Sequence, residues 1–202
     1  MPLPGGPSDK AGNSYERRWT TFALIHLLSG QAQTLRIEVP GDDGVGFESR
    51  LMVDGVAEWH QAKRQRGGGP WTVNALVTEA VLPPWQSNLA GGDRCAFVSS
   101  TSADELRELA DRSRSAESWD EFDQEFLAAA EVRARFERLQ RAWPDLADTD
   151  VYLALQRVRV STIGETDLAG RINDRLRELV TGAEPSPPSK TNYASSSPTS
   201  AP

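Results

Sequence analysis

The dipeptide Asp54-Gly55 constrains the fold of this chain more than any other feature, because it separates two segments that alternate apolar and polar residues. Asp-Gly between two such segments is a strong short-range signal for a two-residue β-hairpin. We therefore expect strands at residues 47–53 and 56–65, with the two residues that flank the turn facing each other.

The remainder of the chain shows strand and helix patterns on both sides of this hairpin. Residues 34–39 predict a strand before it, and residues 14–28 predict a helix before that strand. Further along we expect strands at 94–99 and 157–161 and helices at 72–81, 102–113, 118–143, 149–155 and 165–181, the second and third of them opened by Ser-x-x-Glu capping boxes. This order predicts an α/β fold with a mixed sheet of about five strands flanked by helices.

Both ends of the chain are poor in residues that a core would bury. Residues 1–13 are rich in Pro and Gly, and residues 183–202 contain five Pro and six Ser. We therefore expect a disordered lead-in, one domain over residues 14–182 and a disordered tail. No apolar run approaches the ~18 residues of a membrane span, and the N-terminus lacks the apolar region of a signal peptide, so we expect a cytoplasmic protein.

Composition argues against several kinds of chemistry. Cys95 is the single cysteine and His26 and His60 are the only histidines, so we expect no internal disulfide, zinc site or histidine-based triad. The net charge of −7 argues against a protein that coats nucleic acid non-specifically, because phosphate affinity comes from neutralising many charges at once. Residues 104–125 carry nine carboxylates against three arginines, a pattern typical of solvated helix faces.

The segment EWHQAK at residues 58–63 carries the side chains on which a function can be built. Alternate residues of a strand share a face, so Gln61 and Lys63 should project to one side and His60 to the other. In the hairpin register, Glu48 faces Gln61 at a Cβ separation of about 4.5 to 5.5 Å. A carboxylate, an amide oxygen and an ammonium at one point match a Mg²⁺ or Mn²⁺ site with a cation beside it.

Lysine usage draws attention to the same place. Among 22 basic residues only Lys10, Lys63 and Lys190 are lysines, and Lys63 alone falls within the expected domain. A lysine in a chain so biased toward arginine favours a position that needs a compact, pKa-tunable charge, although an edge-strand lysine with a solvated head is the alternative. Arg64 and Arg66 precede three glycines and add positive charge where a phosphate backbone would approach.

The first acid of the site is open between two residues. Hairpin geometry favours Glu48, whereas the Gly-Asp-Asp turn offers Asp43, and a one-residue slip in register would exchange them. Glu38 on the first strand and Glu16 on the first helix are further candidate ligands. Their alternative interpretations are a solvated strand acid and a helix N-terminal acid favoured by the macrodipole.

A carboxylate on one strand and Gln-X-Lys on the next, behind a helix that bears Glu16, resembles the restriction-endonuclease-like PD-(D/E)XK nuclease superfamily in its Gln-X-Lys variant. The resemblance is closer to the double-stranded-DNA nuclease domains at the N-terminus of bacterial STAND or NACHT-type NTPases and related anti-phage effectors. The segments that carry it are VPGDDGVGFE (39–48), EWHQAKRQ (58–65), FVSS (97–100) and SWDEF (118–122). The likeness covers roughly residues 14–182.

Carried over by position, the resemblance implies that Gln61 binds the metal through its carbonyl oxygen and that Lys63 is the catalytic lysine. Gln61 stands where the superfamily pattern has an acid, which removes one negative charge from the site. We expect a Mg²⁺- or Mn²⁺-dependent DNA endonuclease of a bacterial anti-phage defence system. In it, Glu48 or Asp43 would bind the metal with Gln61, Lys63 would position the attacking water, and both arginines after Lys63 would engage phosphate.

The expected partners are double-stranded DNA and either an NTPase or sensor protein or a second copy of the chain, with no membrane. Such domains normally need a sensor or an oligomer to switch them, and the length of the chain suggests a truncated or stand-alone version. The alternative function is a catalytically inactive nuclease-like module for protein interaction or DNA binding. RNA as the substrate is a third possibility, because metal-assisted phosphodiester cleavage needs the same groups.

Overall fold

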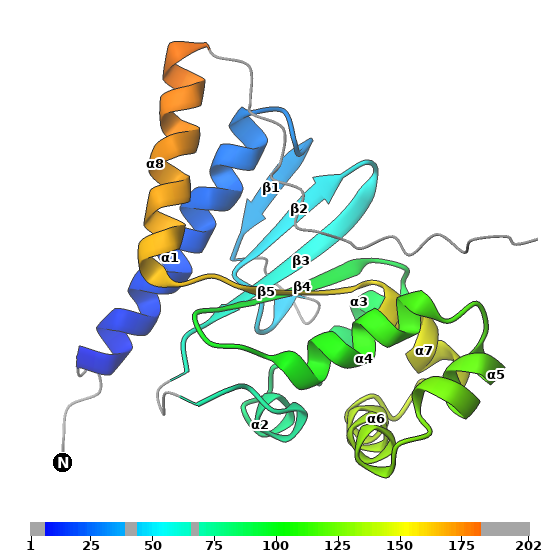
Figure 1. Cartoon of the computed structure of the whole chain (residues 1–202). Coiled ribbons are helices and arrows are strands. Elements are labelled where there is room, and N and C mark those ends of the chain that lie inside the picture. The colour runs from blue at the N-terminus through cyan, green and yellow to red at the C-terminus, as the bar shows by residue number, and fades with distance from the viewer. Residues whose placement is uncertain (1–6, 39–43, 66–68, 183–202) are drawn as a thin grey trace, which may run out of the picture.

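The computed structural model describes residues 7–38, 44–65 and 69–182, with side chains described from Ser14 onward. One five-stranded sheet crosses the molecule between helices that cover both of its faces (Figure 1). The strands are β1 (Thr34–Ile37), β2 (Ser49–Val53), β3 (Val56–Lys63), β4 (Arg94–Ser99) and β5 (Val158–Thr162). The described helical segments are α1 (Pro7–Leu28), α2 (Val73–Thr78), α3 (Trp85–Ala90), α4 (Asp104–Ser115), α5 (Trp119–Glu121), the π-helical turn η2 (Phe122–Phe126), α6 (Ala130–Ala142), α7 (Asp148–Gln156) and α8 (Glu165–Thr181).

The strands lie in the sheet in chain order, from β1 to β5. β1, β2 and β3 form an antiparallel meander, whereas β4 and β5 run parallel to β3. The predicted α/β class with a mixed sheet flanked by helices is therefore confirmed. Because β3, β4 and β5 are parallel, their last residues, Lys63, Ser99 and Thr162, lie along one edge of the sheet.

The predicted hairpin is confirmed together with its register. Val53 pairs with Val56, and the pairing continues to Ser49 opposite His60. Asp54 and Gly55 have φ angles of 53° and 77°, the positive values that a type I′ turn requires. The turn chemistry thus positions the chain that enters β2 beside the chain that leaves β3.

Helices α1 and α8 pack side by side on one face of the sheet (Figure 1). Their buried cluster contains Tyr15, Trp19, Ala62, Val98, Ile163 and Leu168. The Tyr15 hydroxyl is buried and donates a hydrogen bond of 3.0 Å to the carbonyl oxygen of Ile163, two residues before α8 begins. This bond fixes the start of α8 against α1.

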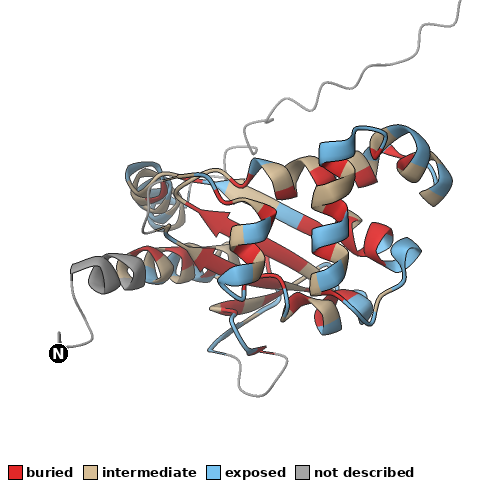
Figure 2. Cartoon of the chain, turned by 90° about the horizontal axis from the view of Figure 1, so that it is seen from below, coloured by how far each residue is buried: buried red, intermediate tan, exposed pale blue. Residues whose placement is uncertain are grey.

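The larger core lies on the opposite face, under the helices from α2 to α7. Figure 2 shows buried residues concentrated along the central strands and on the inward sides of the helices. Three buried tryptophans of this core use their indole N–H groups in hydrogen bonds of 2.8 Å, donated by Trp71 to Ser99 Oγ, by Trp85 to Gln61 Oε1 and by Trp143 to the Leu82 carbonyl. The core therefore reaches the strand that carries the candidate site.

Several boundaries differ from the expectations. Helix α1 begins at Pro7, seven residues before the expected start at Ser14; proline is tolerated in a first turn because its missing N–H would have no helical partner there. Helix α3 was not among the expected helices; Pro84 is its N-cap. Residues 1–6 and the tail at 183–202 lie outside the described residues. No helix in the described ranges is long and apolar enough to cross a membrane.

The long helix expected at residues 118–143 is interrupted after η2, and α6 starts separately at Ala130. Arg112 donates a hydrogen bond of 2.7 Å to the carbonyl of Phe126, and Arg133 donates one of 2.7 Å to the carbonyl of Asp123. These guanidinium groups satisfy carbonyls that lose their helical partners at the break. The prediction of one continuous helix was wrong because arginines remote in sequence stabilise the interruption.

One of the two predicted capping boxes caps its helix with the expected serine. Ser118 Oγ accepts a hydrogen bond of 3.2 Å from the N–H of Glu121. By contrast, α4 begins after Ala103, and no side chain caps it, so the box predicted at Ser102 was wrong. Its glutamate, Glu105, is used elsewhere.

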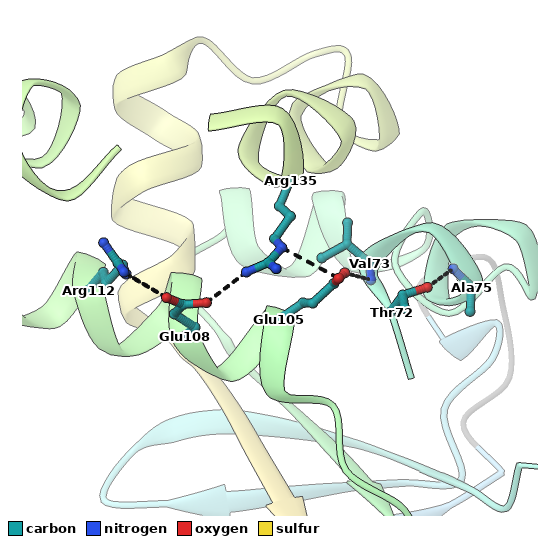
Figure 3. Close-up of polar contacts among 7 residues, drawn as sticks. All are labelled: Thr72, Val73, Ala75, Glu105, Glu108, Arg112 and Arg135. Carbon is teal, nitrogen blue, oxygen red and sulfur yellow. Dashed lines mark hydrogen bonds and ion pairs between the residues drawn. The ribbon is translucent and has the colours of Figure 1, made fainter. Parts of the chain in front are cut away.

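Glu105 joins α4 to two neighbouring helices (Figure 3). Its Oε2 accepts a hydrogen bond of 2.8 Å from the N–H of Val73, and its Oε1 lies 3.4 Å from Arg135 Nε. Arg135 also contacts Glu108 at 2.8 Å, and Glu108 contacts Arg112 at 2.7 Å. Glu105 and Glu108, which belong to the acidic stretch expected to be solvated, therefore take part in an ion network between α4 and α6, and Glu105 also binds α2 through a backbone N–H.

Candidate functional site

The predicted site lies where β3 ends and the chain enters β2. Lys63 is the last residue of β3, and Glu48 immediately precedes β2. Lys63 Nζ donates a hydrogen bond of 2.8 Å to Glu48 Oε1, and the Ala62 N–H donates one of 2.6 Å to Glu48 Oε2. The structure thus brings together Glu48 and Lys63, two of the predicted site residues.

Helix α1 brings a second carboxylate to the same ammonium. Glu16 Oε1 lies 3.6 Å from Lys63 Nζ, and both side chains are about 30% exposed, at 29% and 31%. Glu48 is more enclosed, with 14% of its side chain exposed. We call Glu16, Glu48 and Lys63 the lysine cluster; it holds two carboxylates and one ammonium.

The protonation of the lysine cluster follows from burial and from these contacts. Burial raises the pKa of Glu48, although the Lys63 ammonium and the Ala62 N–H act in the opposite direction. Burial would lower the pKa of Lys63, but the carboxylates of Glu48 and Glu16 outweigh it and hold that pKa above its ordinary value. Lys63 is therefore an ammonium at neutral pH, so it serves as a hydrogen-bond donor and a positive charge and not as a base.

The side chain of Gln61 is buried in the larger core, the one that contains Trp85. It is 2% exposed, and its Oε1 accepts the 2.8 Å hydrogen bond from Trp85 Nε1. A Cβ atom at Gly46, where φ is +83°, would lie 3.3 Å from Gln61 Nε2, so glycine allows the chain to pass close to the amide. The Gln61 amide therefore does not join the lysine cluster through a hydrogen bond within the described residues, and its oxygen keeps one lone pair free of Trp85.

His60 lies on the opposite face from Gln61, as predicted, and forms a buried hydrogen-bond chain that the sequence did not reveal. Trp19 Nε1 can only donate, so its 3.0 Å contact makes His60 Nδ1 an acceptor and places the ring proton on Nε2. Nε2 then donates to Glu58 Oε1 at 2.7 Å. Burial would raise the pKa of Glu58, but the contact with His60 and nearby arginines lowers it. Both ring nitrogens of His60 are thus engaged away from the lysine cluster.

The remaining candidates are only partly described. Arg64 follows Lys63 and is 40% exposed, and its Nε lies 2.9 Å from Glu165 Oε1. Glu38 has a φ of 49°, and its N–H donates a hydrogen bond of 3.2 Å to the Glu48 carbonyl, so its backbone borders the site. Asp43 and Arg66 lie outside the described residues.

The donors of the lysine cluster suit a hard divalent cation. Carboxylate oxygens of Glu48 and Glu16 converge on one ammonium, so this point favours positive charge, and carboxylates are the ligands that Mg²⁺ and Mn²⁺ prefer. Within residues 14–38, 44–65 and 69–182, no group of three or more His, Cys, Asp or Glu side chains is arranged to hold a metal ion. The lysine cluster itself offers two acids as donors. The amide oxygen of Gln61 lies in the core, where it accepts from Trp85.

The chain was compared with family models, curated proteins and solved structures, and none of them matches. Neither family nor activity is therefore assigned by likeness to a known protein. A proposal for the function has to be argued from the lysine cluster and from the sheet edge that carries it.

Proposed function

We propose that this chain is a metal-dependent endonuclease of double-stranded DNA with a restriction-endonuclease-like fold, and that it serves a bacterial anti-phage defence system. The observation that carries the proposal is the 2.8 Å contact of Lys63, the last residue of β3, with Glu48, the residue before β2. Glu16 on the preceding helix supports it, because this acid belongs to the Gln-X-Lys pattern that the sequence resembles. An NTPase or sensor protein, or a second copy of the chain, would switch the activity.

In this proposal Glu48 holds Mg²⁺ or Mn²⁺. Glu16 or Asp43 supplies a second acid, and the carbonyl oxygen of Gln61 supplies a third donor through the lone pair that Trp85 does not use. A bound divalent cation supplies Lewis-acid activation of water and offsets charge on the phosphate. The amide of Gln61 is neutral and attracts the cation less than an acid would. We therefore expect weak metal binding, with a dissociation constant in the millimolar range, and we expect it to depend strongly on both carboxylates.

Lys63 acts as a fixed ammonium in the proposed reaction. It donates a hydrogen bond to a lone pair of the attacking water and offsets the negative charge that develops around phosphorus in the transition state. Its pKa, raised by Glu48 and Glu16, keeps the proton on Nζ throughout the neutral range. Arg64 and Arg66 bind backbone phosphates and hold the DNA against the edge of the sheet.

Cleavage of supercoiled and linear DNA with Mg²⁺ or Mn²⁺ tests the proposal. Lys63→Ala should lower the rate by about 10² to 10³, the usual loss for one transition-state donor. Glu48→Gln should lower it through loss of metal binding, and a chelator should abolish cleavage. Lys63→Arg should fail as well, because a planar guanidinium does not replace a compact ammonium. Glu178→Gln, which removes a carboxylate paired with Arg175 on α8, is the matched control and should cleave normally. Cleavage that survives both Lys63→Ala and Glu48→Gln would refute the assignment.

One observation favours a second function, a catalytically inactive nuclease-like module for interaction or DNA binding. Gln61 is buried and bonded to Trp85, as expected of a residue with a structural role. Calorimetric titration with Mn²⁺ separates the two functions. Heat of binding that disappears in Glu48→Ala and Gln61→Ala supports the enzyme, whereas an absence of heat at millimolar metal supports the module.

A further inference from the structure

A second ion cluster lies beside the lysine cluster and is centred on Glu165. Arg64 Nε lies 2.9 Å from Glu165 Oε1, and Arg18 NH1 lies 3.5 Å from Glu165 Oε2. One guanidinium comes from the end of β3 and the other from α1, and they share a carboxylate in the first turn of α8. The three side chains are 40%, 42% and 34% exposed, so solvent and solutes reach them.

Arg18 and Arg64, which we call the arginine pair, are close in sequence to residues of the lysine cluster. Arg64 directly follows Lys63, and Arg18 lies two residues after Glu16, so α1 and the end of β3 contribute side chains to both clusters. The backbone around them is fixed by the Tyr15 hydroxyl, which donates to the Ile163 carbonyl at 3.0 Å. A phosphate held by the arginine pair would therefore lie next to the proposed cleavage site.

We infer that Arg18 and Arg64 form a binding site for a backbone phosphate of double-stranded DNA, and that Glu165 occupies this site in the free protein and leaves it when DNA binds. The choice of DNA rests on the proposed function; the site itself rests on the geometry. Arg18 becomes a nucleic-acid-binding residue, and Glu165 becomes a competitor that the substrate must displace.

The chemistry of guanidinium groups supports the exchange. Their planar N–H donors fit carboxylate and phosphate oxygens alike, so a pair of arginines that converges on a carboxylate can converge on a phosphate. Exposed ion pairs contribute little to stability, so release of Glu165 is easy. The contact of α8 with α1 does not depend on Glu165, because Tyr15 and the fully buried Leu168 already secure it.

Binding of a short fluorescent DNA duplex, measured by anisotropy in the presence of EDTA, tests the inference without cleavage. Arg18→Gln should remove one phosphate contact, which weakens binding about eightfold at about 0.1 M salt and lowers the slope of log K against log salt by about 0.9. Glu165→Gln should strengthen binding several-fold, because it removes the competitor. This gain should be lost in the double variant Arg18→Gln/Glu165→Gln, where the site has only one guanidinium.

The ion pair of Arg177 with Asp174 on the same helix provides matched controls. Its side chains are 79% and 71% exposed, and Arg177→Gln and Asp174→Asn change the net charge by the same amounts as the test variants. We expect neither control to change the affinity by more than about twofold. Neither should change the slope of log K against log salt by the value of about 0.9 that one phosphate contact contributes. Thermal melting of each variant checks its fold, and Arg18→Lys, which keeps the charge, should recover most of the binding.

Three results would overturn the inference: an Arg18→Gln variant that binds like Arg177→Gln, a Glu165→Gln variant that binds like Asp174→Asn, or no measurable binding of duplex DNA by any variant. The assay contains no metal, so it separates this inference from the nuclease proposal. A protein that binds DNA through Arg18 and never cleaves it contradicts the catalytic proposal alone. A protein that cleaves DNA without dependence on Arg18 or Glu165 contradicts the phosphate site alone.

Discussion

Replacing Lys63 with methionine tests how firmly the lysine cluster is held. The change removes the ammonium partner of the Glu48 carboxylate, which is 14% exposed, and leaves its hydrogen bond with the Ala62 N–H. A hydrogen bond to a charged group contributes about 1.5 to 3 kcal/mol, and breaking a fully buried ion pair costs about 3 to 5 kcal/mol. Because Lys63 is 31% exposed, we expect Lys63→Met to lower the free energy of unfolding by about 1.5 to 3 kcal/mol at neutral pH.

The pH dependence of this loss separates charge from packing. Burial already raises the pKa of Glu48, and removal of the Lys63 ammonium should raise it further. In folded Lys63→Met, Glu48 then binds a proton at a higher pH than in the unfolded chain. The destabilisation is therefore complete above the raised pKa and diminishes as the pH falls through it. A loss caused by packing alone would not change over that range.

Urea denaturation followed by tryptophan fluorescence measures these free energies for the wild type, Lys63→Met, Glu48→Gln and the double variant. We expect the loss of unfolding free energy in the double variant to be about 1 to 2 kcal/mol smaller than the sum of the two single losses, because the second change removes the group that the first left unpaired. Arg177→Met, at an exposed ion pair, is the control and should lose nothing measurable. A coupling below about 0.3 kcal/mol, or a loss that does not vary with pH, would refute the reasoning.

Three further predictions concern the supporting structure. Ser118→Ala should lower the free energy of unfolding by about 1 kcal/mol in urea denaturation, whereas Ser102→Ala should change it little, because the helix after it has no side-chain cap. Trp19→Phe should lower the free energy of unfolding by about 1 to 3 kcal/mol by leaving the buried Nδ1 of His60 without its donor, and an unchanged denaturation midpoint would contradict that bond. Burial, together with His60, lowers the pKa of His26, so the folded wild type should lose stability as the pH falls below about 6.5, and thermal melting should show a smaller loss in His26→Asn.

Local chemistry explains why part of the site was predictable. Asp54-Gly55 dictates a two-residue turn, the turn dictates the register, and the register places Glu48 beside the end of β3. The period of two along β3 separates His60 from Gln61 in the same way. These steps involve residues close together in sequence, so composition and spacing suffice.

Contacts between elements far apart in sequence escaped prediction. Nothing near Gln61 indicates that Trp85 would donate to its oxygen, and Glu105 satisfies the Ser-x-x-Glu pattern while its carboxylate serves Val73 in another helix. The pairing of Glu165 with Arg64 joins α8 to β3 across about half of the chain. In each case several acids or aromatics fit the local pattern equally well, and only the packing of the helices on the sheet selects one.

The two ion clusters suggest how a chain of net charge −7 can accommodate DNA and a metal ion. In the free protein, the carboxylates of the lysine cluster face an internal cation, and the arginine pair faces the internal anion Glu165. A divalent cation would add positive charge where the first cluster is acidic, and a phosphate would replace Glu165 in the second. A bound phosphate raises the affinity for the cation, and a bound cation raises the affinity for phosphate, because opposite charges attract. Metal and DNA should therefore bind with positive coupling, because the acidic charge of the chain repels DNA until a bound cation offsets part of that charge.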